Sequence, residues 1–79
     1  MYYYQRIKDL REDADENQAE IAELLNTTQQ QYSKWERGER EIPLHHAIKL
    51  AQHYKVSMDY LIGLEKIKRK VKWPKEWNL

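Results

Sequence analysis

The chain has 79 residues, which is enough for one small domain. It carries 14 Lys and Arg against 13 Asp and Glu, a formal net charge of +1, and it has no cysteine. Disulfides, thiolate metal sites and cysteine nucleophiles are therefore excluded. A domain this small has little interior for a deep catalytic pocket, so we expect a binding module and not an enzyme. We expect no membrane helix, which needs about 20 apolar residues, no secretory leader, and a cytoplasmic location.

The charge is unevenly distributed along the chain. Residues 1–64 hold eight Lys and Arg against eleven Asp and Glu, a net charge of −3, whereas residues 65–79 hold six against two, a net charge of +4. We therefore divide the chain into a mildly acidic domain, residues 1–64, and a basic tail, residues 65–79, that contains Trp73 and Trp77. A chain this close to neutral does not match a protein that binds nucleic acid through charge alone.

A first helix is predicted from about Tyr3 to Asp13. Its apolar face repeats at spacings of four, three and four, the period of one helical face. The members of that face are Tyr3, Ile7, Leu10 and Ala14. The charged residues between them, Arg6 included, are expected on the opposite side, facing solvent.

A second helix is predicted over residues 17–25. Asn17 is a favourable N-cap, and Glu20 follows it at the spacing of a capping box. Asn26, directly after the last apolar pair, suits the left-handed position that ends a helix. Glu16 precedes the cap, and a carboxylate there predicts a looser or more exposed turn between the first two helices.

A third helix is predicted over residues 28–36, with Thr28 as its cap and Gly38 as its end. It has only two apolar residues, Tyr32 and Trp35, and their spacing of three predicts that both face the core. Its first residues, Gln29–Gln31, are three consecutive glutamines.

Two further helices complete the predicted fold. Pro43 suits the first position of a fourth helix, and Ser57 caps a short fifth helix, Met58–Ile62, ended by Gly63. With only two glycines and two prolines for turns, we predict an all-α fold of five short helices. The predicted core is Tyr3, Ile7, Leu10, Ile21, Leu24, Leu25, Trp35, Leu44, Ile48, Leu50, Ala51, Val56 and Leu61.

The second and third predicted helices have the spacing of a helix-turn-helix. In that motif the second helix enters the DNA major groove, and its first residues face the base edges. A glutamine amide has donors and an acceptor that can pair with adenine N6 and N7. Three glutamines at the start of that helix therefore indicate binding to double-stranded DNA.

At this point the sequence resembles a known family. Residues 4–64 resemble the helix-turn-helix domain of phage repressor and Cro-like regulators. The resemblance is carried by NQAEIAELLNTTQQQYSKWERGE (17–39), which is close to lambdoid phage repressors, and by YKVSMDYLIG (54–63). It implies a five-helix, lambda-repressor-like domain that regulates transcription, specifically as a repressor. It also implies a homodimer on a pseudo-palindromic operator, with half-sites about one DNA turn apart.

The resemblance also implies roles for single positions. Base reading is expected from Gln29, Gln30, Gln31 and Lys34. Phosphate contacts are expected from Gln18, Thr28, Ser33, Arg37 and Arg40. Arg11 and Glu36 match a structural ion pair between the first helix and the end of the third. No cofactor and no metal are expected, because His46 and His53 share a helical face without the three or four ligands of a tetrahedral zinc site.

Some features leave other functions open. Glu39 and Glu41 lie where lambdoid repressors often carry basic residues, and their charges should weaken the salt-dependent part of DNA affinity. One alternative is the antitoxin of a toxin–antitoxin pair, with a toxin or other protein bound by the tail. Another is an interaction module that no longer binds DNA. The tail itself could be frayed, could contact DNA backbone, or could dock on the domain or a second subunit through Val71, Trp73 and Trp77.

Overall fold

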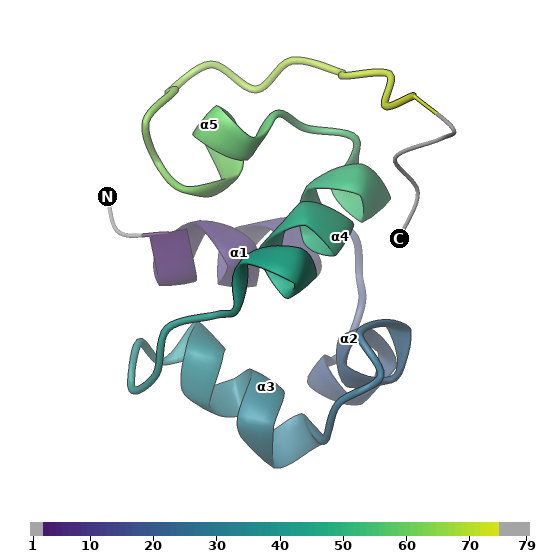
Figure 1. Cartoon of the computed structure of the whole chain (residues 1–79), viewed down its shortest axis with the longest axis vertical. Helices are drawn as coiled ribbons and strands as arrows, with labels where there is room; N and C mark the ends of the chain where they lie inside the picture. The colour runs from purple at the N-terminus through teal and green to yellow at the C-terminus, as the bar shows by residue number, and fades with distance from the viewer. Residues whose placement is uncertain (1–2, 75–79) are drawn as a thin grey trace.

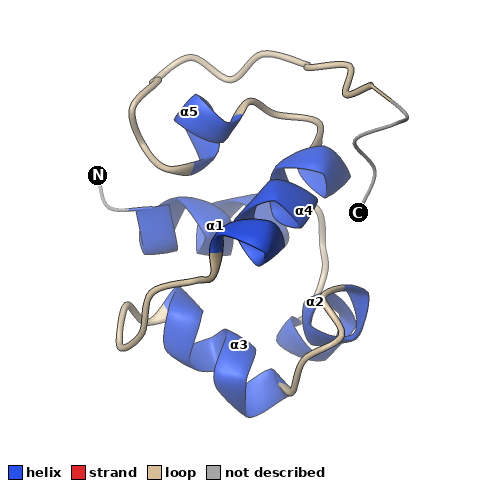
Figure 2. Cartoon of the chain, viewed as in Figure 1, coloured by secondary structure: helices blue, strands red, loops and turns tan. Residues whose placement is uncertain are grey.

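Five helices and their connections make up the part of the chain that the computed structural model describes, residues 3–74. They are α1 (Tyr3–Asp13), α2 (Gln18–Leu24), α3 (Gln29–Glu36), α4 (Leu44–Tyr54) and α5 (Met58–Leu61). In Figure 1, α2 and α3 lie at one pole, α5 at the other, and α1 and α4 between them. Figure 2 shows only helices and loops over these residues, which confirms the predicted all-α class. None of the helices within 3–74 is long and apolar enough to cross a membrane.

The helix starts follow from local capping chemistry. The Asn17 side chain accepts a hydrogen bond from the Glu20 amide at 2.8 Å, and the Glu20 carboxylate accepts one from the Asn17 amide at 2.9 Å. This is a complete capping box, as predicted. Thr28 accepts from the Gln31 amide at 3.1 Å, and Ser57 caps α5 in the same way. Only α4 starts differently from the prediction, since Pro43 is its extended N-cap and not its first helical residue.

A left-handed residue follows each of the five helices, with Asp15 (φ 57°) after α1 and, as predicted, Gly63 (φ 89°) after α5. Asn26 (φ 56°) and Gly38 (φ 75°) follow α2 and α3, as predicted, while Lys55 (φ 57°) ends α4. At Gly38 a side chain is excluded for a second reason. A Cβ atom placed there would lie 2.8 Å from Cε1 of Tyr4, a distance that real contacts do not reach. The loop after α3 therefore turns tightly against α1.

The core draws residues from every helix. It consists of Ile7, Leu10, Ile21, Ala22, Leu25, Tyr32, Trp35, Ala47, Leu50, Ala51, Val56 and Leu61. Most of the predicted core is confirmed, although Tyr3, Leu24 and Ile48 are only half-buried. Leu44 was a wrong prediction, because it is 69% exposed. It begins α4 and lines an open surface groove together with Ile42 and Ile62.

Arg6 is buried, which contradicts its predicted place on the solvent side of α1. Its guanidinium donates to the carbonyl oxygens of Tyr60 at 2.7 Å and Glu65 at 3.3 Å. The guanidinium carbon also lies 3.8 Å from the centroid of the Tyr60 ring. The reason is that α5 and the residues after it cover this side of α1, so that Arg6 joins the N-terminal helix to the end of the fold.

The tail forms an extended segment over α5 and α4, which we call the strap (residues 65–74). Figure 1 shows it running over α5 and back toward the end of α4. The Val71 amide donates to the Lys55 carbonyl at 2.8 Å, and the Trp73 indole donates to the Val56 carbonyl at 3.0 Å. Trp73 is half-buried against the core. Docking of the tail on the domain is thus confirmed for Val71 and Trp73, whereas Trp77 lies outside the described residues.

Candidate nucleic-acid interface

The first turn of α3 faces solvent because its two aromatic residues face inward. Tyr32 and Trp35 are 0% and 2% exposed, and their rings meet edge to face with centroids 6.3 Å apart. On the other side of the helix, Gln29 and Gln30 are exposed and Gln31 is half-buried. The burial of Tyr32 and Trp35 therefore determines which glutamines of α3 are accessible to a partner.

A surface hollow joins most of the predicted site residues. It is lined by Gln18, Gln29, Gln30, Ser33, Lys34 and Arg37. The remaining predicted residues, Thr28, Gln31 and Arg40, do not line it, and Arg40 lies exposed in the loop after α3. The structure thus brings the start of α2 beside the outer face of α3, where six residues predicted to read bases or hold phosphates form one surface.

A second hollow continues this surface onto α1. It shares Gln18, Ser33 and Arg37 with the first and adds Tyr4, Gln5 and Lys8. The sequence analysis did not single out these α1 residues. A signal was present, since Tyr4, Lys8 and Arg11 recur at spacings of four and three. Because Arg11 pairs with Glu36 of α3, Tyr4 and Lys8 must lie on the side of α1 that faces α3.

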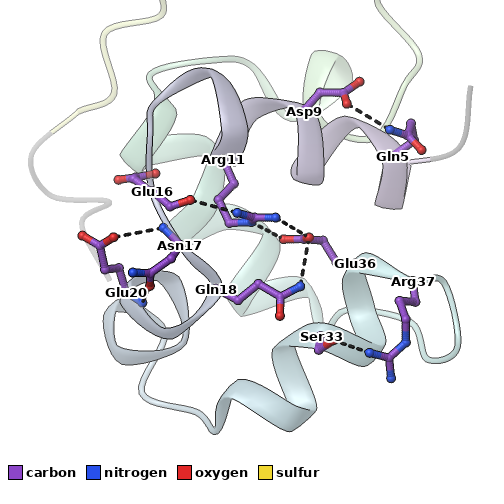
Figure 3. A network of polar contacts seen from close by, with 10 residues as sticks. All are labelled: Gln5, Asp9, Arg11, Glu16, Asn17, Gln18, Glu20, Ser33, Glu36 and Arg37. Atoms are coloured by element: carbon purple, nitrogen blue, oxygen red, sulfur yellow. Dashed lines mark hydrogen bonds and ion pairs between the residues drawn. The ribbon is translucent and has the colours of Figure 1, made fainter.

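Arg11 and Glu36, which also line the second hollow, form a two-pronged ion pair (Figure 3). Arg11 donates from Nε to Oε2 of Glu36 at 2.7 Å and from Nη2 to Oε1 at 2.9 Å. The Gln18 amide adds a donor to Oε1 of Glu36 at 3.2 Å, and Arg11 Nη1 donates to the Glu16 carbonyl at 2.8 Å. These bonds connect the end of α1, the start of α2 and the end of α3, and they fix the Gln18 side chain at the rim of the hollow.

The Glu36 carboxylate is ionised despite its burial. Its side chain is 2% exposed, and burial alone would raise its pKa. Hydrogen bonds from Arg11 and Gln18 outweigh that penalty and lower the pKa of Glu36 below its ordinary value. Burial, followed by the nearby Glu36 charge, raises the pKa of Tyr32 and keeps its hydroxyl neutral.

Glu16 contacts the end of α4. Its Oε2 lies 2.7 Å from Nε2 of His53, and its side chain is 20% exposed. Asp13 and Asp15 before it are exposed, as expected for this turn, and so is Ala14, which was wrongly predicted on the apolar face of the first helix; Glu16 itself is half-buried. Burial, and then the charge of Glu16, raise the pKa of Tyr54 next to it. Glu16 therefore packs against α4 instead of loosening the turn.

Two residues predicted to hold phosphates contact each other and an acidic neighbour. Arg37 donates from Nη1 to the Ser33 hydroxyl and from Nε to the Glu39 carboxylate. The Arg37 and Glu39 side chains are 52% and 53% exposed. The hydrogen bond between them, more than their charges at a distance, raises the pKa of Arg37 and lowers that of Glu39.

The histidines make ring contacts. The His46 ring lies 5.0 Å from the Trp35 ring and 4.0 Å from the His45 ring, centroid to centroid. Burial, followed by the charges of His45 and Lys49, lowers the pKa of His46. Among residues 3–74, no group of three or more His, Cys, Asp or Glu side chains is placed to hold a metal ion.

Residues 7–61, the five-helix unit without the strap, match the family model described as Helix-turn-helix. The chain belongs to this family. It is 37% identical over 65 residues to the HTH-type transcriptional regulator ImmR of Bacillus subtilis (strain 168). That alignment covers 82% of this chain and 51% of ImmR, so the chain spans about half the length of this curated relative.

A solved structure supports the same assignment. The fold is similar to the P22 c2 repressor protein in complex with synthetic operator 9T, with a TM-score of 0.74 and 25% sequence identity. The match covers 82% of this chain and 98% of the repressor chain. The predicted resemblance to phage repressors, and the lambda-repressor-like fold with it, are thereby confirmed.

Proposed function

We propose that this protein is a transcriptional regulator, specifically a repressor, that binds double-stranded DNA and reads the major groove with α3. The observation that carries the proposal is the hollow in which Gln29, Gln30 and Lys34 of α3 meet Gln18 of α2. The similarity to the regulator ImmR and to a repressor solved with its operator supports it. In a prokaryotic cell such a regulator works in the cytoplasm, where the chromosome lies, and it needs no catalytic step.

The chemistry of the surface divides between bases and backbone. Glutamine amides suit adenine and a lysine ammonium suits guanine, so we assign base reading to Gln29, Gln30, Gln31 and Lys34. Phosphate contacts are assigned to Gln18, Thr28, Ser33, Arg37 and Arg40. Gln18 still has its amide oxygen and one N–H after the bond to Glu36. The Thr28 hydroxyl accepts from the Gln31 amide, which leaves its own hydrogen able to donate.

The proposed binding unit is a two-fold dimer on a pseudo-palindromic operator, with half-sites about 34 Å apart. Support comes from an apolar groove that involves the start of α4 and the end of α5. Leu44 and Ile62, 69% and 39% exposed, line it together with Tyr3, Ile42 and Met58. Exposed apolar residues that share one groove are typical of a contact surface, and in a two-fold dimer the same patch serves both copies.

The test is a selection of bound sequences from random duplexes, followed by binding measurements on single-site variants of the selected operator. A two-fold consensus with half-sites one turn apart is expected. Gln30→Ala should then lose discrimination at one base pair per half-site, by about 1–3 kcal/mol. The control is Glu23→Ala on α2, since Glu23 lines a different hollow, beside Glu16 and His53. Equal weakening by Gln30→Ala on every sequence would contradict base reading by this residue.

A second candidate function is supported by the strap. Residues 66–74 contain five Lys and Arg and no Asp or Glu, and Figure 1 draws the strap at the pole opposite α3. Cations in that position suit an acidic protein partner, such as the toxin of a toxin–antitoxin pair, better than the duplex held by α3. A module without DNA binding is the remaining alternative. Failure to shift random duplex DNA at low salt would favour it.

A further inference from the structure

The Glu39 carboxylate is hydrogen-bonded to Arg37, the arginine to which we assign a phosphate contact. Arg37 is the C-cap of α3, and its Nε donates to the Glu39 carboxylate while its Nη1 donates to the Ser33 hydroxyl. A guanidinium binds phosphate and carboxylate through the same planar N–H groups. In the protein alone, an internal anion therefore takes up hydrogen-bonding capacity that a DNA phosphate would use.

The loop geometry directs Glu39 toward this position. Gly38 takes a left-handed φ of 75°, and the Glu39 amide donates to the Lys34 carbonyl at 2.9 Å. The chain thus folds back over the last turn of α3, which leaves the Glu39 side chain beside Arg37. The hydrogen bond from Arg37, and to a smaller extent the charge of Lys34, lower the pKa of Glu39.

Stability does not explain the contact. Both side chains are about half exposed, and ion pairs in such positions contribute little to folding. The same loop carries a second carboxylate, Glu41, that lines the apolar groove with Ile42 and Leu44 on another part of the surface. Of the two acidic residues predicted to repel DNA, only Glu39 reaches a residue of the candidate interface among the contacts recorded for residues 3–74.

We infer that Glu39 is an internal competitor for the DNA backbone, held on Arg37 so that a phosphate must displace it or bind beside it. This inference rests on the proposed function. Its consequence is a lower affinity for all sequences alike, because phosphate contacts are independent of sequence. Base contacts then supply a larger share of the affinity for the correct operator.

The test is Glu39→Gln, with affinity for a random duplex measured over a range of salt concentrations. The variant should bind several-fold more tightly at low salt. The slope of log affinity against log salt should become steeper by up to about 0.9 per protomer, the value for one additional neutralised phosphate. Binding to the selected operator should tighten by a similar factor. A purely structural role would not change the salt slope.

Two variants separate local competition from a change in net charge. Glu23→Gln makes the same charge change at an exposed position on α2, outside this loop and the apolar groove, and should alter affinity much less. In an Arg37→Gln background, Glu39→Gln should give little further gain. An equal gain from Glu23→Gln, or an undiminished gain without Arg37, would overturn the inference without contradicting DNA binding itself. If neither the natural protein nor Glu39→Gln bound any duplex at low salt, both the inference and the proposed function would be rejected.

Discussion

Glu36 is the single residue at which the two helices of the candidate interface and α1 meet. Its carboxylate accepts hydrogen bonds from Arg11 and from Gln18, and it is almost fully buried. A buried charge is tolerated only when such partners replace water. The position of Gln18 at the DNA-facing rim therefore depends on a residue that does not itself face DNA.

We predict that Glu36→Gln lowers the free energy of unfolding by about 3 kcal/mol at pH 7, because it leaves the Arg11 guanidinium with a neutral partner. The value is at the low end for a broken buried pair, since Arg11 keeps 12% of its side chain exposed. Urea unfolding monitored by far-ultraviolet circular dichroism provides the measurement. Glu23→Gln, an exposed position on α2, is the matched control and should change stability by less than about 0.5 kcal/mol.

The same pair predicts a dependence on pH. Because the pKa of Glu36 is lower in the folded protein than its ordinary value, its contribution is present above that value and is lost as the pH falls through the folded pKa. The difference between natural protein and Glu36→Gln should therefore be largest near neutrality and should shrink below about pH 4.3, the ordinary pKa of glutamate. A constant difference from pH 7 to pH 3 would contradict this account.

At the residue scale, the helical period predicted the burial of some side chains correctly and of others wrongly. Tyr32 and Trp35 were predicted inward from their spacing alone, and both are buried. Arg6 and Leu44 were predicted on the wrong sides. A helical period indicates which residues share a face, but it does not say which other segment covers that face. The segment that covers Arg6 comes from the opposite end of the chain.

Among the elements, the strap is the one that lies beyond residues 7–61, the part that matches the family model. It has no regular secondary structure, and it is fastened to the turn between α4 and α5 by Val71 and Trp73. Trp73 supplies both a hydrogen bond and apolar contact to the core. The strap therefore belongs to the fold, although it lies outside the helical unit.

We predict that Trp73→Ala releases the strap and lowers the free energy of unfolding by about 1–3 kcal/mol. This is less than the loss for a fully buried tryptophan, because Trp73 is half-buried. Hydrogen exchange at the Val71 amide, which donates to Lys55, should speed up far more than exchange at core amides of α1. Trp73→Phe is the control that keeps a ring and removes the indole donor. A loss near 1 kcal/mol is expected for it. Unchanged exchange at Val71 in Trp73→Ala would rule out the fastening role.

The elements themselves were predictable because their ends are encoded locally. The capping residues Asn17, Thr28 and Ser57 lie within three residues of the amides they accept from, so sequence spacing alone reveals them. The strap has no such signal, because its two attachments join residues 16 and 17 positions apart. The α1 residues of the second hollow were missed for a similar reason, since only the packing of α1 on α3 brings them there.

Across the whole molecule, the densest run of cations lies away from the candidate interface, in the strap. The helical part, residues 1–64, has a net charge of −3, and the strap, whose residues 66–74 include five Lys and Arg, lies at the pole away from α3 in Figure 1. The near-neutral net charge of the chain is thus the sum of an acidic helical part and a basic tail. We therefore expect the cations of the strap not to add to the phosphate contacts proposed for the outer face of α3.

We predict that the triple variant Lys66→Gln, Lys68→Gln and Lys70→Gln binds the selected operator with unchanged affinity and salt slope. Electrophoretic shift or fluorescence anisotropy over a salt series provides the measurement. Lys34→Gln, a single change within the hollow, should weaken binding and is the positive control. A slope reduced by about 0.9 for each lysine removed from the strap would instead mean that the strap contacts the DNA backbone.

The close approach of Tyr4 to Gly38 also affects how this sequence can vary. Two separate constraints act on residue 38, a left-handed backbone and an aromatic ring at contact distance. A smaller residue at position 4 would remove only the second constraint, after which asparagine, which tolerates left-handed angles, becomes acceptable at position 38. Positions 4 and 38 are therefore coupled across 34 residues of chain. In descendants of this protein, a change at position 38 should follow a change at position 4 and not precede it.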